Sequence, residues 1–150
     1  MPEQSLAEKL FDEQQVATRA KDRFRLSVIR MLRSELQYGA IAKKGPLDAQ
    51  EELAILTREV KRRQEALGDY ERSGRQDLLA DLKKEIEIFK KYLPEQLSEE
   101  ELERLVREAV SESGAGSKQE MGKVMSLLMP RIKGKADGGL VRQIVEKILQ

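Results

Sequence analysis

The sequence contains no cysteine and no histidine among its 150 residues. Without cysteine there is no disulfide and no thiolate nucleophile, and a zinc site built from Cys and His is excluded as well. A Ser-His or Cys-His catalytic pair is also excluded, because the general base is missing. We therefore expect no catalytic residue, no metal site and no cofactor in this chain.

Long apolar runs and targeting signals are lacking too. The longest uncharged apolar run, 124–130, is far shorter than the roughly 20 residues that a membrane helix needs. The opening residues, MPEQSLAEKLFDEQQ, lack the basic and apolar regions of a signal peptide. These features predict a cytoplasmic protein that has no membrane partner.

Charged residues are abundant, at 37% of the chain, whereas aromatic residues make up only 4%. High charge with few aromatic residues, glycines and prolines is typical of a predominantly helical protein. The formal net charge is only +1, so any site for a polyanion must be a local patch. Residues 95–116 carry seven Glu and two Arg, whereas 117–150 carry seven Lys or Arg and three acids, so the basic patch is expected in the last part of the chain.

Helix starts are marked by a Ser or Asp followed three residues later by Glu, a capping box in which each residue satisfies a backbone amide of the other. A further start is expected near Asp22, and the Asp48 box is a weaker variant of the usual Ser/Thr form. The boxes are Ser5/Glu8, Asp48/Glu51, Ser98/Glu101 and Ser117/Glu120.

Apolar residues recur at steps of three and four, and no stretch alternates with period two, so the pattern predicts an all-α protein. Pro94 ends the helix before it and indicates a boundary. We predict an N-terminal bundle of longer helices over 1–93 and a compact three-helix tail domain over 94–150. The helices expected in the tail domain are 99–113, 118–129 and 137–149.

The basic segment, residues 131–137, joins the last two predicted helices. Lys133 and Lys135 flank Gly134, and the next helix, which begins near Asp137, offers free amides and a positive dipole end to a phosphate. A mononucleotide loop of the Walker type is disfavoured, because Ala136 stands where Ser or Thr is required. The plain alternative is that Asp137 caps the helix and the lysines are merely solvated.

A second basic stretch, REVKRRQ at 58–64, places Arg58, Lys61 and Arg62 on one helical face. A solvated face with a Glu59–Arg63 pair is the simpler explanation of this stretch. Since no aromatic residue follows Tyr92, a basic tail domain should contact phosphates and the shape of folded RNA rather than stack on bases. The candidate RNA contacts are Lys133, Gly134, Lys135, Arg131, Lys123, Arg58, Lys61 and Arg62.

Four segments of the sequence resemble the YqeY-like family of small bacterial proteins. The tail domain of that family is similar to the tail of the B subunit of the glutamine-dependent aspartyl/glutamyl-tRNA amidotransferase. The last of these segments, 121–141, is the most specific. Its matched positions are Gly122, Val124, Met125, Lys133, Gly134, Lys135, Ala136 and Asp137. The four segments are RLSVIRMLRSEL (25–36), REVKRR (58–63), YLPEQLSEEEL (92–102) and MGKVMSLLMPRIKGKADGGLV (121–141).

The resemblance implies an all-helical fold in two parts and a role near tRNA, because the amidotransferase tail contacts the elbow of the tRNA. It does not imply activity, since the catalytic parts of that enzyme have no counterpart here. The leading hypothesis is a non-catalytic tRNA-binding accessory protein that assists an amidotransferase or an aminoacyl-tRNA synthetase. The alternatives are a subunit of a carbon–nitrogen ligase that uses glutamine as amido donor, and a helical protein–protein adaptor.

Overall fold

A computed structural model describes residues 4–149 of the chain. These residues form seven α-helices and one short 3-10 helix without a β-strand, which confirms the predicted all-α class. The helices group into a first unit, Met1–Leu93, and a second unit, Pro94–Gln150, and each unit has its own hydrophobic core. Across residues 4–149, no helix has both the length and the apolar character needed to cross a bilayer.

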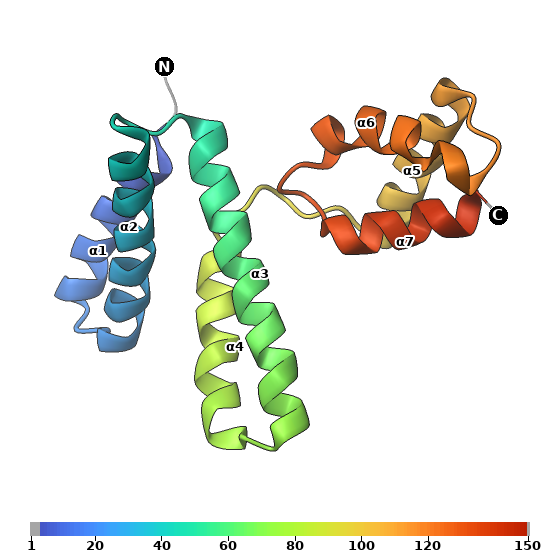
Figure 1. Ribbon diagram of the computed structural model, residues 1–150. Helices are drawn as coiled ribbons and strands as arrows, with labels where there is room; N and C mark the ends of the chain where they lie inside the picture. Colours follow the sequence, from blue (N-terminus) through green and yellow to red (C-terminus); the bar gives the residue numbers. More distant parts are fainter. Residues whose placement is uncertain (1–3, 150) are drawn as a thin grey trace. The chain divides into compact units, whose positions relative to one another are not determined.

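The first unit consists of two helical hairpins, in which α1 pairs with α2 and α3 pairs with α4 (Figure 1). The predicted starts at Ser5, Asp22 and Asp48 are confirmed, because each side chain accepts a hydrogen bond from the amide three residues on. The Asp48/Glu51 box is complete in both directions. The helices are α1 (Leu6–Arg19), α2 (Arg23–Lys43), α3 (Ala49–Ser73) and α4 (Gln76–Lys90).

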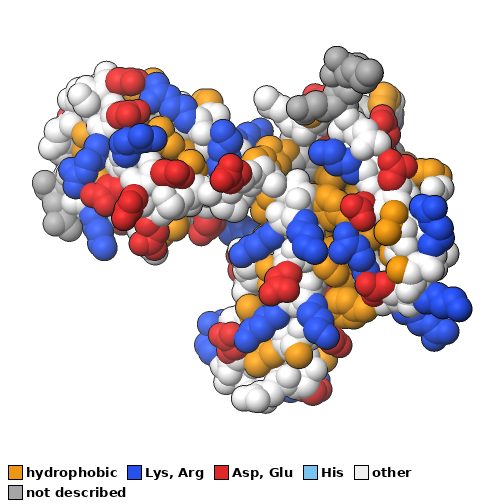
Figure 2. Space-filling view, turned by 180° about the vertical axis from the view of Figure 1, so that it is seen from behind, with side chains coloured by type: hydrophobic (Ala, Val, Ile, Leu, Met, Phe, Trp, Pro, Cys, Tyr) orange, Lys and Arg blue, Asp and Glu red, His pale blue; other side chains and the backbone are white. Residues whose placement is uncertain are grey.

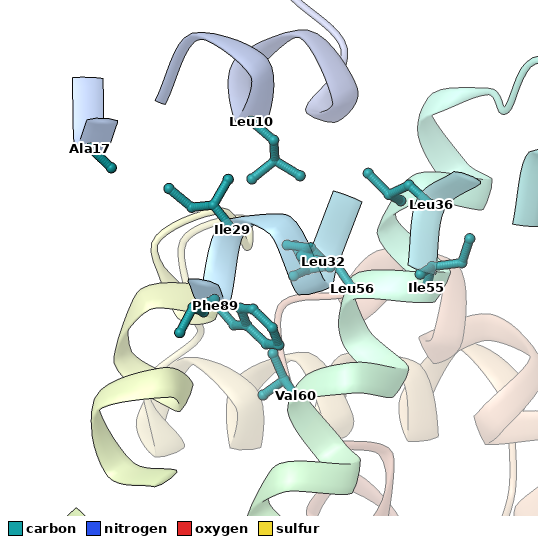
Figure 3. Packing of buried hydrophobic residues seen from close by; sticks show 10 residues of the cluster. Leu10, Ala17, Ile29, Leu32, Leu36, Ile55, Leu56, Val60 and Phe89 are labelled. Carbon is teal, nitrogen blue, oxygen red and sulfur yellow. The ribbon is translucent and has the colours of Figure 1, made fainter. Parts of the chain in front are cut away.

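The core of the first unit gathers apolar side chains from all four helices. Figure 3 shows the Phe89 ring of α4 beside Val60 of α3, while Leu10 of α1 points toward the residues of α2. Gly39 lets α2 approach α3 closely, because a Cβ at this position would lie 2.6 Å from Ile55 Cδ1. The fully buried members include Leu10, Ile29, Leu32, Leu56 and Phe89.

Two carboxylates are buried in the first unit. Glu52 is 5% exposed, and its two oxygens accept hydrogen bonds from the amides of Leu6 and Ala7, both at 3.0 Å. These amides belong to the first turn of α1, which has no partner for them within the helix. Glu52 of α3 therefore caps α1 from 45 residues away. The other buried carboxylate, Glu59, is 4% exposed and is surrounded by arginines.

The second unit packs three helices around an aliphatic core that contains no aromatic ring in its described residues. α5 begins and ends where the sequence predicts, with a complete Ser98/Glu101 capping box and a left-handed Gly114 at its C-cap. Alternating turns of α6 and α7 supply Val124, Leu128 and Val141 to this core. The elements are α5 (Glu99–Ser113), a 3-10 helix (Lys118–Glu120), α6 (Met121–Ile132) and α7 (Gly138–Ile148).

Two predictions about α6 are wrong. The Ser117 hydroxyl makes no capping hydrogen bond, because a 3-10 turn over 118–120 precedes the helix. The helix also continues past Pro130 to Ile132. Proline removes only one backbone donor near the end of a helix, and Leu128 and Ile132 lie one turn apart and are both buried. Burial of Ile132 therefore keeps the last turn helical.

Candidate nucleic-acid interface

The basic segment begins in the last turn of α6 and ends at the start of α7. The helix stops at Ile132, and Lys133 takes an extended conformation with φ −55° and ψ 120°. Gly134 then adopts φ +76°, which a residue with a Cβ rarely adopts, and the Lys135 amide donates to the Ile132 carbonyl at 2.8 Å. The glycine is thus required for the turn that connects the two helices.

The turn is held in place by residues at the entrance of the second unit. The Gln96 side-chain amide donates to the Gly134 carbonyl at 2.8 Å and to the Pro94 carbonyl at 2.7 Å. The Leu97 amide donates to the Lys135 carbonyl at 2.9 Å. This pairing is not visible in the sequence, because no spacing rule links residues 38 positions apart.

Lys133 and Lys135 are exposed on either side of this turn, whereas Gly134 is buried. Neither lysine takes part in an ion pair with a carboxylate among the described residues. Gly134 offers no surface to a ligand, and its carbonyl is already bonded to Gln96. Of the three residues at the centre of the predicted site, the two lysines are available to an anion and the glycine shapes the backbone between them.

The start of α7 lies directly beyond the lysines. Asp137 occupies the N-cap position in an extended conformation, but its side chain makes no capping hydrogen bond. The side chain does lie near the first turn, since a Cβ on Gly139 would be 3.3 Å from Asp137 Oδ2. The surface above Gly138 is open, because no atom would lie within 4 Å of a Cβ there. Asp137 therefore does not occupy these amides, although its charge opposes an anion.

The other two candidates of the second unit are paired with acids. Arg131 donates to Glu112 at 2.7 Å, and this hydrogen bond, helped by the charge of Glu112, raises the pKa of the arginine. Lys123 lies 3.6 Å from Glu120, one turn before it on the same side of the helix. Both side chains are solvent-exposed, so an incoming phosphate would compete with a neighbouring carboxylate at each position.

The basic stretch of α3 has its own counter-charges. Glu59 lies 3.5 Å from Arg58, 3.1 Å from Arg62 and 3.1 Å from Arg63, which includes the predicted Glu59–Arg63 pair. Arg58 also approaches Glu35 at 3.6 Å. Lys61 is exposed and joins none of these pairs. The arginines of this stretch are thus organised around a buried carboxylate.

Arg63, the third arginine paired with Glu59, takes part in the packing of the first unit. Its guanidinium carbon lies 4.3 Å from the centroid of the Phe89 ring, a cation–π distance, and a nitrogen lies 2.8 Å from Met31 Sδ. The side chain is only 12% exposed. A residue that sequence reading places in a solvated basic run is in fact part of the packing between α2, α3 and α4.

Basic and acidic side chains are mixed over the face of the molecule seen in Figure 2, which has no single continuous basic surface. Among residues 4–149 there is no group of three or more acidic side chains placed to hold a metal ion. Lys133 and Lys135 have no acidic partner among the described residues, as is also true of exposed lysines such as Lys118, and what distinguishes the pair is its place on either side of a fixed turn that leads into α7.

Comparison with known proteins identifies a family for the chain. No curated protein matches the chain, but the family model of Yqey-like proteins matches residues 7–149. This match spans both units, from the start of α1 to the end of α7. It agrees with the resemblance of the four sequence segments to the same family. The chain therefore belongs to the family of Yqey-like proteins.

Proposed function

We propose that this protein binds tRNA without catalysing a reaction on it, and that the contact runs along the phosphate backbone at the basic segment. The observation that carries the proposal is the pair Lys133 and Lys135, two exposed cations that flank a fixed turn and have no carboxylate partner in the described structure. Lysine side chains placed in this way neutralise phosphates and release counterions, which is the main source of affinity for nucleic acids.

The start of α7 adds a second source of attraction. Its first amides point away from the helix, and they carry the positive end of the helix dipole. The Asp137 side chain leaves them without a capping bond, and the surface at Gly138 is open. A phosphate that contacts Lys135 would find these amides next along the chain.

Folded RNA fits the basic segment better than a single strand or a nucleotide does. The second unit has no Phe, Tyr or Trp on which a base could stack, and the segment lacks the Walker spacing. Contacts to phosphates alone position a protein on a duplex without reading its sequence. The tRNA elbow, suggested by the resemblance to the amidotransferase tail, is a folded surface of this kind.

The absence of Cys and His from the chain supports a non-catalytic role. An accessory protein of this type would act beside an enzyme that uses tRNA, and the resemblance favours an amidotransferase or an aminoacyl-tRNA synthetase. A contribution to a carbon–nitrogen ligase would then come through delivery or orientation of the tRNA, because the chain offers neither a thiolate nor a Ser-His pair with which to attack glutamine.

The test is a filter-binding titration of unfractionated bacterial tRNA with the full chain at 0.1 M monovalent salt. Changing Lys133 and Lys135 to Ala should weaken binding about 25- to 60-fold, the combined effect of two phosphate contacts at this salt concentration. The matched control is Arg104 and Arg107 to Ala on α5, which removes the same charge from the acidic face and should leave affinity within about twofold.

A helical adaptor is the competing function, and one observation favours it. Leu127, Met129 and Leu140 of the second unit are between 37% and 41% exposed. Met121 and Met125, which lie on α6 at four-residue steps from Met129, pack on the core instead. If the full chain fails to bind tRNA at any salt concentration, the exposed apolar side chains become the first place to look for a protein partner.

A further inference from the structure

We propose that Gln96 is a positioning residue for RNA binding: it fixes the turn from which Lys133 and Lys135 project. The inference rests on the proposed function, since it concerns how the same two lysines are presented. Gln96 lies outside the basic segment and outside every residue that we expect to touch RNA. It belongs to the segment YLPEQL, which contains none of the residues proposed to contact RNA.

The geometry singles out the side-chain amide of Gln96. Its nitrogen has two N–H groups, and the structure places one acceptor for each, the carbonyls of Pro94 and Gly134, at 2.7 Å and 2.8 Å. Gly134 is buried and Gln96 is exposed, so this partly buried hydrogen bond is the one that a Gln96 side chain supplies to the Gly134 carbonyl. A glutamate at this position would direct a charged oxygen at a carbonyl oxygen instead.

A backbone bond strengthens the same attachment. Residues 96 and 97 bind residues 134 and 135 in order, because the Leu97 amide donates to the Lys135 carbonyl at 2.9 Å. Leu97 also packs against the core of the second unit, and Ser98 then starts α5. The turn is thus attached to the start of α5 by two consecutive hydrogen bonds, in addition to its covalent links to α6 and α7.

This attachment matters for binding because Lys133 and Lys135 are the immediate neighbours of Gly134. A turn that is held in one conformation presents both side chains with a fixed backbone separation before the ligand arrives. A turn free to move must be ordered when RNA binds, and the free energy of that ordering is lost from the affinity. Gln96 should therefore change the affinity without changing the number of phosphates contacted.

The experiment is a double-mutant cycle on tRNA binding by the full chain. Gln96→Ala should weaken binding roughly three- to tenfold, the equivalent of about one hydrogen bond, while the slope of log affinity against log salt stays the same. In the background of Lys133→Ala plus Lys135→Ala, the same substitution should have no further effect, because Gln96 acts through these lysines. Gln119→Ala, an exposed glutamine of the same unit, is the matched control.

The outcomes separate the two proposals. If the lysine variant binds tRNA as well as the unaltered chain, the proposed function fails, whatever Gln96 does. If the lysines matter but Gln96→Ala has no effect, or weakens binding equally in both backgrounds, the positioning role is overturned. Hydrogen exchange guards against a trivial loss of fold: the Leu97 amide should lose protection in Gln96→Ala, and the Val106 amide in the core should keep it.

Discussion

The two units of this protein treat charge in opposite ways. The first unit buries two carboxylates: Glu52 accepts hydrogen bonds from two amides of α1, and Glu59 pairs with arginines of its own helix, α3. The core of the second unit is aliphatic, and its described residues include no buried charged side chain. Arg58, Arg62 and Arg63 of the first unit are paired with a buried carboxylate, whereas Lys133 and Lys135 of the second unit are exposed and have no acidic partner among the described residues. The position of the counter-charge, rather than the local density of Lys and Arg, indicates which basic segment can bind an anion.

The strongest test of this contrast is Glu59→Gln. Arg63 is 12% exposed and would lose its nearest carboxylate, so the first unit should be destabilised by about 3 kcal/mol, as expected when one partner of a buried ion pair is removed. Urea unfolding followed by tyrosine fluorescence is the appropriate measurement. Tyr38, Tyr70 and Tyr92 all belong to the first unit, and the chain has no Trp, so the signal reports on that unit alone.

The control for Glu59 is the same substitution in the exposed pair of the second unit. Glu103 accepts from Arg107 at 2.9 Å one turn away, and both side chains are more than half exposed. Glu103→Gln should change stability by less than about 0.5 kcal/mol when unfolding is followed by circular dichroism at 222 nm. Equal effects of the two substitutions would show that burial does not distinguish the units.

A smaller effect is expected from Glu52→Gln. The amide side chain keeps one acceptor oxygen for Leu6 or Ala7 but loses the second acceptor and the negative charge at the start of α1. Loss of a capping interaction typically destabilises a protein by about 1 kcal/mol, so we expect about 1 to 2 kcal/mol in the same tyrosine assay. A loss below about 0.3 kcal/mol would mean that α1 does not depend on this carboxylate.

The smallest effect on stability belongs to Asp137→Asn in the second unit. Asp137 stands at the N-cap of α7 without a capping hydrogen bond, so the free energy of unfolding should change by less than about 0.5 kcal/mol. Removing its charge beside Lys135 should instead strengthen tRNA binding several-fold. A destabilisation comparable to that of Glu52→Gln, together with unchanged affinity, would make Asp137 an ordinary helix cap.

Sequence reading predicted the helix starts because capping is local. Ser5, Asp48 and Ser98 each bond an amide three residues away, and such spacings are visible in the letters. The extent of α6 could not be predicted in the same way, since Ile132 is held in the helix by residues of other elements. Burial overrode the tendency of Pro130 to end the helix.

The candidate site was likewise predictable only where its features are local in sequence. The pattern of Lys and Gly identified the turn, but nothing in it indicated that Gly134 is buried or that Gln96 holds its carbonyl. Likewise, the run REVKRR suggested the Glu59–Arg63 pair but gave no sign that Glu59 would be buried and would also pair with Arg58 and Arg62. Carboxylates both near and distant in sequence, such as Glu59 for Arg62 and Glu112 for Arg131, determine which basic residues remain available to an anion.

The measurement that tests the central claim most directly is the salt dependence of tRNA affinity for the full chain and for the variant with Lys133 and Lys135 changed to Ala. Each phosphate contact contributes about 0.7 to 0.9 to the slope of log affinity against log salt concentration, so the slope should become shallower by roughly 1.4 to 1.8. Arg58→Ala plus Arg62→Ala, whose guanidinium groups are already paired with Glu59, should leave the slope nearly unchanged. An unchanged slope in the lysine variant would contradict the proposed phosphate contact, and a shallower slope in the arginine variant would place that contact on α3 instead.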